Sequence, residues 1–182
     1  MFLRTERLFL RPAWLEDAPE LARAIGHEPV VRMLARVPWP YREDHARAWI
    51  ESQRDPYLLS LLVTLPDEGG RITGVCGLHR EDGEVEVGYW ITPADWGQGY
   101  ATEALRGVLS LARLAGHCRL VGRHAADNPA SQRVLRKAGF RPTGRAREFH
   151  SLGRMAQVDA PEYALELCEA DGPQDAPMRK AA

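Results

Sequence analysis

The stretch from residue 84 to residue 115 constrains the fold most, because it predicts a strand, a glycine turn and a helix in direct succession. Residues 84–91 alternate polar and apolar side chains, as a half-buried strand does. Apolar residues then recur at helical spacing over 101–115, and a proline and two glycines interrupt the chain between the two patterns. The first amides of a helix have no intrahelical acceptor and carry the positive end of the helix dipole, so such a turn is suited to holding a phosphate.

The two glycines of this turn leave its function open between phosphate binding and a plain strand-to-helix connection. Gly97 and Gly99 lack a Cβ, so a ligand can approach the main chain closely. No Gly-Lys-Ser/Thr follows, which excludes a P-loop, and the third glycine of the dinucleotide fingerprint is absent.

Four stretches, in this order, resemble motifs of the GNAT N-acetyltransferases, in the RimJ/RimL-like branch. They are an opening strand at Thr5–Pro12, a central strand at Glu86–Trp90, an acyl-CoA pyrophosphate loop at Trp96–Ala104 and a further cofactor helix at Asn128–Phe140. The resemblance extends from near the N-terminus to about Leu167.

The order of the expected elements predicts a mixed α/β fold, because strands alternate with helices in the middle of the chain and form hairpins at both ends. Strands are expected at 7–11, 57–65, 71–79, 84–91, 118–124, 141–150 and 158–167, and helices at 15–25, 29–33, 42–53, 101–115 and 128–139. The resemblance implies the GNAT acyl-CoA N-acyltransferase fold: a twisted, mostly antiparallel sheet flanked by helices, in which two central parallel strands splay apart and the pantetheine arm lies in the gap. We expect one domain over residues 1–168 and a disordered tail over 169–182, which is rich in Asp, Gly, Pro, Gln and Ala.

Composition excludes several classes of partner. The chain has 182 residues and a formal net charge of −1, so no bulk electrostatic attraction to nucleic acid or to a membrane is expected. No apolar run is long enough to span a bilayer.

The cysteines predict a cytoplasmic protein with reduced thiols, because there are three of them and none forms a CxxC pair. Charged residues stand where a signal peptide needs its apolar core, which agrees with that location. Six scattered histidines without ligand spacing predict no metal site.

The resemblance implies acetyl-CoA as the cosubstrate and assigns residues to it. Main-chain groups of Trp90 and Ile91 would meet the pantetheine amides, and an amide at or near residue 91 would bind the thioester carbonyl. The cofactor-binding residues expected in the loop are Trp96, Gly97, Gln98, Gly99, Tyr100, Ala101 and Thr102. The wider family usually has Gln or Arg where this chain has Trp96, which could stack on the loop or on the cofactor instead.

Asn128 and Ser131 belong to the second cofactor segment. Asn128 matches the asparagine that bonds the pantetheine arm in the family, which is the role expected here; an N-cap for the following helix is the alternative, and the two roles are compatible. The wider family often places a tyrosine acid where this chain has Leu135, which cannot donate a proton. Ser131 is the substitute indicated by the motif, as a donor to the cofactor sulfur or as a packing residue, and Tyr89 and Tyr163 remain open as alternatives.

Glu86 is the candidate general base, acting directly or through water, because several family members carry their base at this position of the central strand. Its alternative is a solvated or ion-paired strand residue. His79 is a rival base, and none of the cysteines lies in a motif that would support a covalent route.

The acceptor is expected to be a primary amine that attacks directly in a ternary complex. Neutralising a lysine amine at pH 7 costs about 4–5 kcal/mol, against about 1 kcal/mol for an α-amine, which favours a protein N-terminus of the ribosomal-protein type or another amine of low pKa, including a small molecule. Val30, Met33, Trp39, Tyr41 and the last two strands could line the acceptor site or belong to the core. A homodimer through the last strands is a further expectation. A non-catalytic acyl-CoA sensor or an interaction protein is the alternative to an enzyme.

Overall fold

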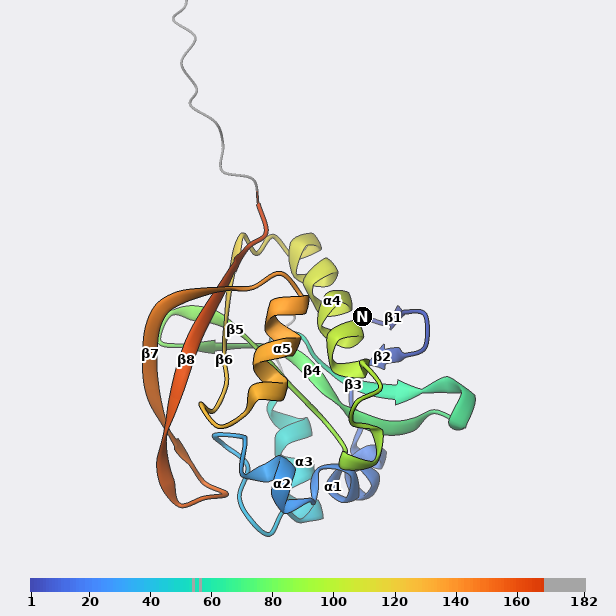
Figure 1. The fold of residues 1–182 in the computed structure, drawn as a ribbon. Helices are drawn as coiled ribbons and strands as arrows, with labels where there is room; N and C mark the ends of the chain where they lie inside the picture. Colours follow the sequence, from blue (N-terminus) through green and yellow to red (C-terminus); the bar gives the residue numbers. More distant parts are fainter. Residues whose placement is uncertain (54, 56, 169–182) are drawn as a thin grey trace, which may run out of the picture.

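The sheet of this protein has eight strands in the order β1-β2-β3-β4-β5-β6-β8-β7 in the computed structural model, which describes residues 1–53, 55 and 57–168 (Figure 1). The strands are β1 (Leu3–Arg4), β2 (Phe9–Arg11), β3 (Ser60–Leu65), β4 (Arg71–Glu81), β5 (Glu84–Ile91), β6 (Arg119–Arg123), β7 (Arg141–Ser151) and β8 (Ala156–Glu166). Neighbours pair antiparallel except β5 and β6, which run parallel.

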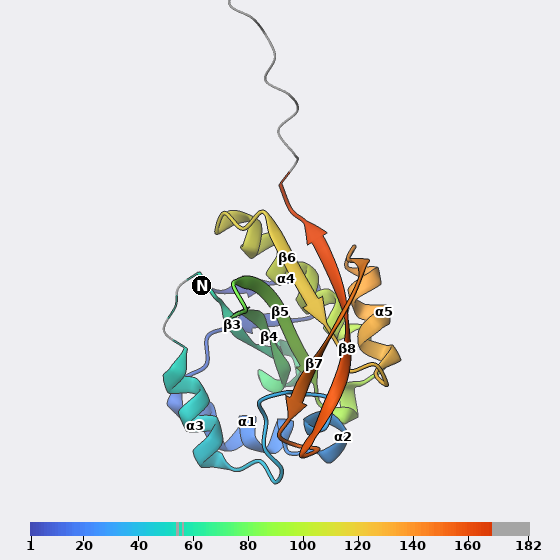
Figure 2. The same cartoon turned by 90° about the vertical axis from the view of Figure 1, so that its left-hand side faces the viewer.

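Helices cover both faces of the sheet. They are α1 (Ala18–Ile25), α2 (Glu28–Val31), α3 (Glu43–Ser52), α4 (Tyr100–Leu114) and α5 (Pro129–Lys137), with short 3-10 turns at Leu15–Asp17, Pro66–Glu68 and Pro93–Asp95. One apolar cluster joins α4 and α5 to the sheet, and a second joins α1 and α3 to the opposite face. Figure 2 shows α1 and α3 on one side of the sheet and α5 on the other.

The two central strands separate soon after they meet. The parallel register joins Glu86 to Val121 and Val87 to Gly122, and residues 88–91 continue β5 beyond it. On its other side β6 stays paired with β8 along its whole length. The carboxyl ends of β5 and β6 therefore diverge, and α4 and α5 follow these two ends after the loops 92–99 and 124–128. This is the splayed arrangement that the sequence resemblance implies.

The β7–β8 hairpin reaches across to the segment after α2. Leu152 N–H donates to the carbonyl of Ala35 at 2.9 Å, and Ser151 Oγ donates to the carbonyl of Leu34 at 2.9 Å. Arg154 from the hairpin turn adds a two-pronged pair with Asp127, with both N–O distances at 2.9 Å. These bonds hold the hairpin over one end of the sheet, where the views of Figures 1 and 2 agree in placing it beside α2.

The predicted mixed α/β fold is confirmed, with boundaries that differ by a few residues. The strand β1 was not expected, because two residues carry no period that a sequence can show. The predicted tail, residues 169–182, lies outside the described residues. None of the described helices combines the length and the apolar character that crossing a bilayer requires.

The expectation of three reduced thiols is wrong for two of them. Cys118 and Cys168 form a disulfide, and Cys76 is free and buried. Leu167 N–H donates to the carbonyl of Cys118 at 2.7 Å, so the antiparallel pairing of β6 and β8 brings the two cysteines together. Their separation of 50 residues gave no local spacing from which the pair could be recognised.

Candidate active site

The glycine turn leads into α4 as a helix start with free amides. Gly97 and Gly99 have φ angles of +80° and +81°, a region that side chains with a Cβ rarely adopt. The Glu103 N–H donates to the carbonyl of Gly99 at 3.1 Å, which is the first bond of the helix. Helix geometry therefore leaves the amides from Gly99 to Thr102 without intrahelical acceptors, at the positive end of a 15-residue helix.

Two side chains fix this loop to the sheet. The Asp95 carboxylate accepts from both Nη atoms of Arg71, at 2.9 and 3.1 Å, and from Thr73 Oγ1 at 2.5 Å. The Arg71 and Thr73 hydrogen bonds hold the pKa of Asp95 below its ordinary value, against the opposing effect of burial. Trp96 Nε1 donates to the carbonyl of Ile91 at 2.7 Å, and half of its surface stays exposed. The indole that replaces the usual polar residue thus fastens the loop to the end of β5.

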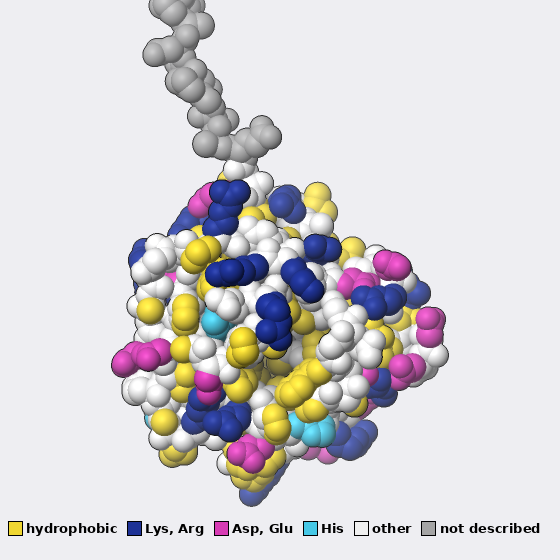
Figure 3. Space-filling model, in the orientation of Figure 1, with side chains coloured by type: hydrophobic (Ala, Val, Ile, Leu, Met, Phe, Trp, Pro, Cys, Tyr) yellow, Lys and Arg dark blue, Asp and Glu magenta, His cyan; other side chains and the backbone are white. Residues whose placement is uncertain are grey.

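The N-terminal segment supports the loop from the other side. Arg7 pairs with Glu103 of α4 at 2.7 Å, donates to the carbonyl of Gln98 at 3.0 Å and lies 4.9 Å from the centre of the Tyr100 ring. A groove of about 570 Å³ opens here, lined by Leu3, Thr5, Glu6, Arg7, Gly99, Thr102, Glu103, Arg106, Gly107, Ser110 and Lys137. Figure 3 shows Lys and Arg side chains gathered over α4 and α5 on this face.

The main chain of β5 divides its polar groups between β4 and the gap. Thr92 N–H donates to the carbonyl of Thr73 at 2.7 Å, and a Cβ built on Gly74 would come within 2.1 Å of the Trp90 carbonyl oxygen. Because successive peptide groups of a strand point to opposite edges, the N–H groups of Tyr89 and Ile91 point to the edge that β6 has left. The N–H of Ile91 thus faces the gap, whereas the N–H and the carbonyl of Trp90 point to β4.

The start of α5 carries Asn128 and Ser131. Asn128 Oδ1 accepts from Ser131 N–H at 3.0 Å, so the N-cap function is present and the amide NH₂ group is left for another partner. Tyr89 Oη lies 2.8 Å from Ser131 Oγ and 3.1 Å from the Ser131 carbonyl. Leu135 is fully buried and takes part in the core.

Glu86 is buried and ion-paired on the face of the sheet opposite to Tyr89. Only 8% of it is exposed, and Arg123 Nη1 donates to its Oε2. Burial raises the pKa of Glu86, and the Arg123 charge opposes that shift. Arg123 also binds Glu84 at 2.9 Å and Glu162 at 2.5 Å, so one guanidinium holds three carboxylates. Both alternatives considered for Glu86, a base and an ion-paired residue, remain compatible with this position.

His79 of β4 is the cross-strand neighbour of Glu86 in β5. Its ring lies over Gly88, where a built Cβ would be 3.5 Å from His79 Nδ1. Burial lowers the pKa of His79, and the positive charge of Arg36 lowers it further, which favours the neutral, basic form. Both candidate bases thus lie on one face of the β4–β5 hairpin.

Two residues of this region were missed by the sequence analysis. Arg123 organises the carboxylates, but an arginine in a strand has no local signal for such a role. His124 follows it, with Nδ1 donating to the carbonyl of Ala125 at 2.8 Å and its ring 5.5 Å from the Tyr163 ring. Its Nε2 is buried without a hydrogen-bond partner among the described residues.

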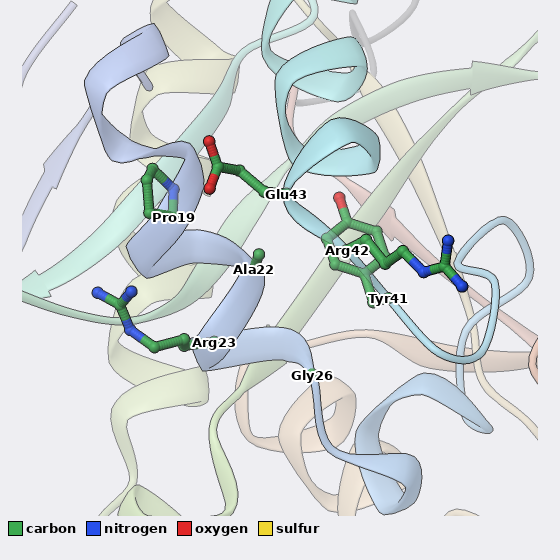
Figure 4. A pocket seen from close by; sticks show the side chains of 7 residues that line it. All are labelled: Pro19, Ala22, Arg23, Gly26, Tyr41, Arg42 and Glu43. Carbon is green, nitrogen blue, oxygen red and sulfur yellow. The ribbon is translucent and has the colours of Figure 1, made fainter.

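A second cavity, of about 470 Å³, lies between α1 and α3, away from the loop (Figure 4). It is lined by Pro19, Ala22, Arg23, Gly26, Tyr41, Arg42 and Glu43. Tyr41, expected at the acceptor site or in the core, lines this cavity and packs against the apolar cluster of α1 and α3, and burial together with the charge of Asp44 raises its pKa to about 12. Val30 is buried, whereas Trp39 is 45% exposed. Within residues 1–53, 55 and 57–168, no group of three or more His, Cys, Asp or Glu side chains could hold a metal ion, and the absence of a metal stays a prediction.

A family model for the acetyltransferase (GNAT) domain matches residues 7–141. The chain belongs to the GNAT acetyltransferase family. It is therefore an acyltransferase, and the matched GNAT region contains the glycine turn, both candidate bases and the start of α5.

Known proteins agree with membership of the GNAT family. The chain is 28% identical over 167 residues to an uncharacterised N-acetyltransferase, p20, of Bacillus licheniformis, covering 86% of this chain and 92% of that one. A solved GNAT-family acetyltransferase from Bacillus anthracis superposes with a TM-score of 0.76 at 22% identity, covering 92% of this chain and 99% of the other. RimL, a ribosomal L7/L12 alpha-N-protein acetyltransferase solved in complex with coenzyme A, gives 0.75 at 19% identity, with coverages of 91% and 98%.

Proposed function

We propose that this enzyme transfers an acetyl group from acetyl-CoA to a primary amine by direct attack in a ternary complex. The observation that carries the proposal is the free helix start beside the gap between β5 and β6. The amides at 98–102 and the Thr102 hydroxyl bind the diphosphate, and the pantetheine arm follows the gap toward the amide of Ile91. The coenzyme A complex of RimL, a protein of similar fold, supports the same class of cosubstrate.

The groove beside the loop adds positive charge for the remaining phosphate of the cosubstrate. Arg106 and Lys137 line it together with Arg7, and Arg106 Nη2 is held by the Lys137 carbonyl at 2.8 Å. Since Arg7 is already paired with Glu103, Arg106 and Lys137 are the cations proposed to face the ligand.

The proposed catalytic groups belong to β5 and to its neighbours β4 and α5. The Ile91 amide binds the thioester oxygen as charge develops on it. Glu86 accepts the proton of the amine, directly or through water, with His79 as the rival base on the same face. Asn128 bonds the pantetheine arm through its free amide group, and Ser131 lies beside the sulfur.

The acceptor is proposed to be an amine of low pKa. The cost of neutralising an α-amine at pH 7 is about 1 kcal/mol, against about 4–5 kcal/mol for a lysine side chain. A protein N-terminus agrees with this cost and with the activity in the name of RimL, and a small amine is the second candidate. A homodimer and a cytoplasmic location stay predictions; the exposed edge strand β7 is mostly polar.

The experiment is a screen for release of the coenzyme A thiol from acetyl-CoA with N-terminal peptides, polyamines, amino acids and aminoglycosides. The proposal expects turnover with at least one α-amine or small amine and little with internal lysine peptides. Release with none of these amines, in a protein that binds acetyl-CoA, would instead indicate a non-catalytic sensor.

A further inference from the structure

A tyrosine from β5 crosses to the first turn of α5 at the point where the central strands part. Tyr89 lies two residues beyond Val87, the last residue of β5 that pairs with β6. Its hydroxyl oxygen is 2.8 Å from Ser131 Oγ and 3.1 Å from the Ser131 carbonyl oxygen. A carbonyl can only accept, so the tyrosine donates there, and the serine hydroxyl is free to donate to Tyr89 Oη.

The leaving thiolate needs a proton, and the nearby side chains differ in their ability to give one. Leu135 has no polar atom and is fully buried. A serine hydroxyl is a very weak acid, and an unperturbed phenol, with a pKa of roughly 10, is a much stronger one. Burial raises the pKa of Tyr89 above its ordinary value, but burial disfavours the anion of the neighbouring serine as well. Of the two hydroxyls at the start of α5, the phenol is therefore the better proton donor for a thiolate.

We propose that Tyr89 is the catalytic acid that protonates the coenzyme A sulfur, and that Ser131 is a positioning residue that holds the tyrosine hydroxyl. This inference rests on the proposed acetyl transfer. The amine nitrogen bonds to the acetyl carbon, the carbon–sulfur bond breaks and its electron pair stays on sulfur. Tyr89 gives its proton to that sulfur, the base takes a proton from nitrogen, and the tyrosinate regains a proton from solvent through the Ser131 hydroxyl.

The surroundings of Tyr89 keep its hydroxyl protonated before the transfer step. Burial raises its pKa, and the Ser131 hydrogen bond opposes this shift only in part. The side chain also packs against the core that joins β5 to α4 and α5, which limits its motion. Because Ser131 offers both a hydroxyl and a carbonyl, removal of the hydroxyl alone leaves the carbonyl contact in place.

The test compares Tyr89→Phe with Ser131→Ala, using acetyl-CoA and the best amine of the screen. We expect Tyr89→Phe to lower kcat about 100-fold with a nearly unchanged KM for acetyl-CoA, and Ser131→Ala to lower it less than about tenfold. The reverse order would assign the proton to serine, and equal kcat in wild type and Tyr89→Phe would overturn the inference. No turnover by the wild type would overturn the proposed function itself.

A second measurement separates proton donation from a structural effect. The selenium analogue of acetyl-CoA releases a weaker base that needs no proton, so the kcat ratio of wild type to Tyr89→Phe should fall from about 100 to near 1 with this donor. A ratio that stays near 100 would mean that the phenol acts only by packing.

If Tyr89→Phe does not fold, a ring-fluorinated tyrosine at position 89 keeps the shape and is more acidic. Its kcat should then fall on the alkaline side at a lower pH than that of the wild type, and an unshifted profile would overturn the inference.

Discussion

Glu86 and Arg123 form a buried ion pair across the parallel junction of β5 and β6, with Arg123 Nη1 donating to Glu86 Oε2. The same guanidinium holds Glu84 and Glu162, and Glu162 is 1% exposed. Glu86 belongs to the two-residue register that joins the strands, and Arg123 follows Gly122, the last residue of β6 in that register. The pair therefore ties the strand that carries the candidate base to the strand that leads into Asn128.

Removal of this guanidinium should cost stability. Arg123→Met leaves Glu86 and Glu162 buried without their common partner, and breaking a buried pair in this way costs about 3–5 kcal/mol. Unfolding in urea, followed by circular dichroism, measures the loss. Arg47→Met, which breaks an exposed pair with Glu43 on α3, is the control and should cost less than about 1 kcal/mol. Similar losses in both variants would contradict the role given to Arg123.

The pH dependence of turnover tests Glu86 as the base. Burial raises its pKa, so the ionised, basic form of the wild type is lost as the pH falls through this raised value. Glu86→Gln should lower kcat/KM most at the higher pH, where the wild-type carboxylate is ionised, and the acidic limb of the profile should disappear. An acidic limb that persists in Glu86→Gln and vanishes in His79→Asn would assign the base to His79.

Gly99→Glu should abolish binding of the cosubstrate. The new side chain would bring bulk and negative charge to the helix start, and it would also sit at a φ of +81°. Gly70→Glu is the matched control, because Gly70 has the same φ of +81° in the open β3–β4 turn. Titration calorimetry with coenzyme A should show binding to the control and none to Gly99→Glu. Tight binding by Gly99→Glu would remove the loop from the proposed site.

Asp95 should stabilise the loop only while it is ionised. Its pKa is lowered in the folded protein, so its contribution is present above the unfolded value, roughly 3.9, and is lost as the pH falls through the folded value. Asp95→Asn should therefore reduce the free energy of unfolding at pH 7 and have a smaller effect near pH 3. Urea unfolding at both pH values checks this, and an equal loss at both would show that charge is not the cause.

The sequence was informative where function depends on a local pattern. The strand, the glycine turn and the start of α4 lie within one stretch, so alternation and glycine spacing predicted the loop, which the φ angles of Gly97 and Gly99 now make concrete. The splay of β5 and β6 came from the resemblance, since no periodicity encodes which strands pair. The extent of one domain over residues 1–168, and the ligands of each loop residue, stay predictions.

Contacts between distant segments could not be predicted. Arg123 binds carboxylates 37 and 39 residues away, and Tyr89 bonds a serine 42 residues away. The Cys118–Cys168 bond depends on the register of β6 and β8 in the same way. Each is fixed by the sheet order, which places segments side by side that share no sequence signal.

A crystal structure with coenzyme A tests the central claim most directly. The account predicts that the diphosphate lies within hydrogen-bonding distance of the amides of residues 98–102, and that the pantetheine arm passes between β5 and β6 toward Ile91. Coenzyme A bound elsewhere, or absent from crystals soaked at millimolar excess, would contradict it.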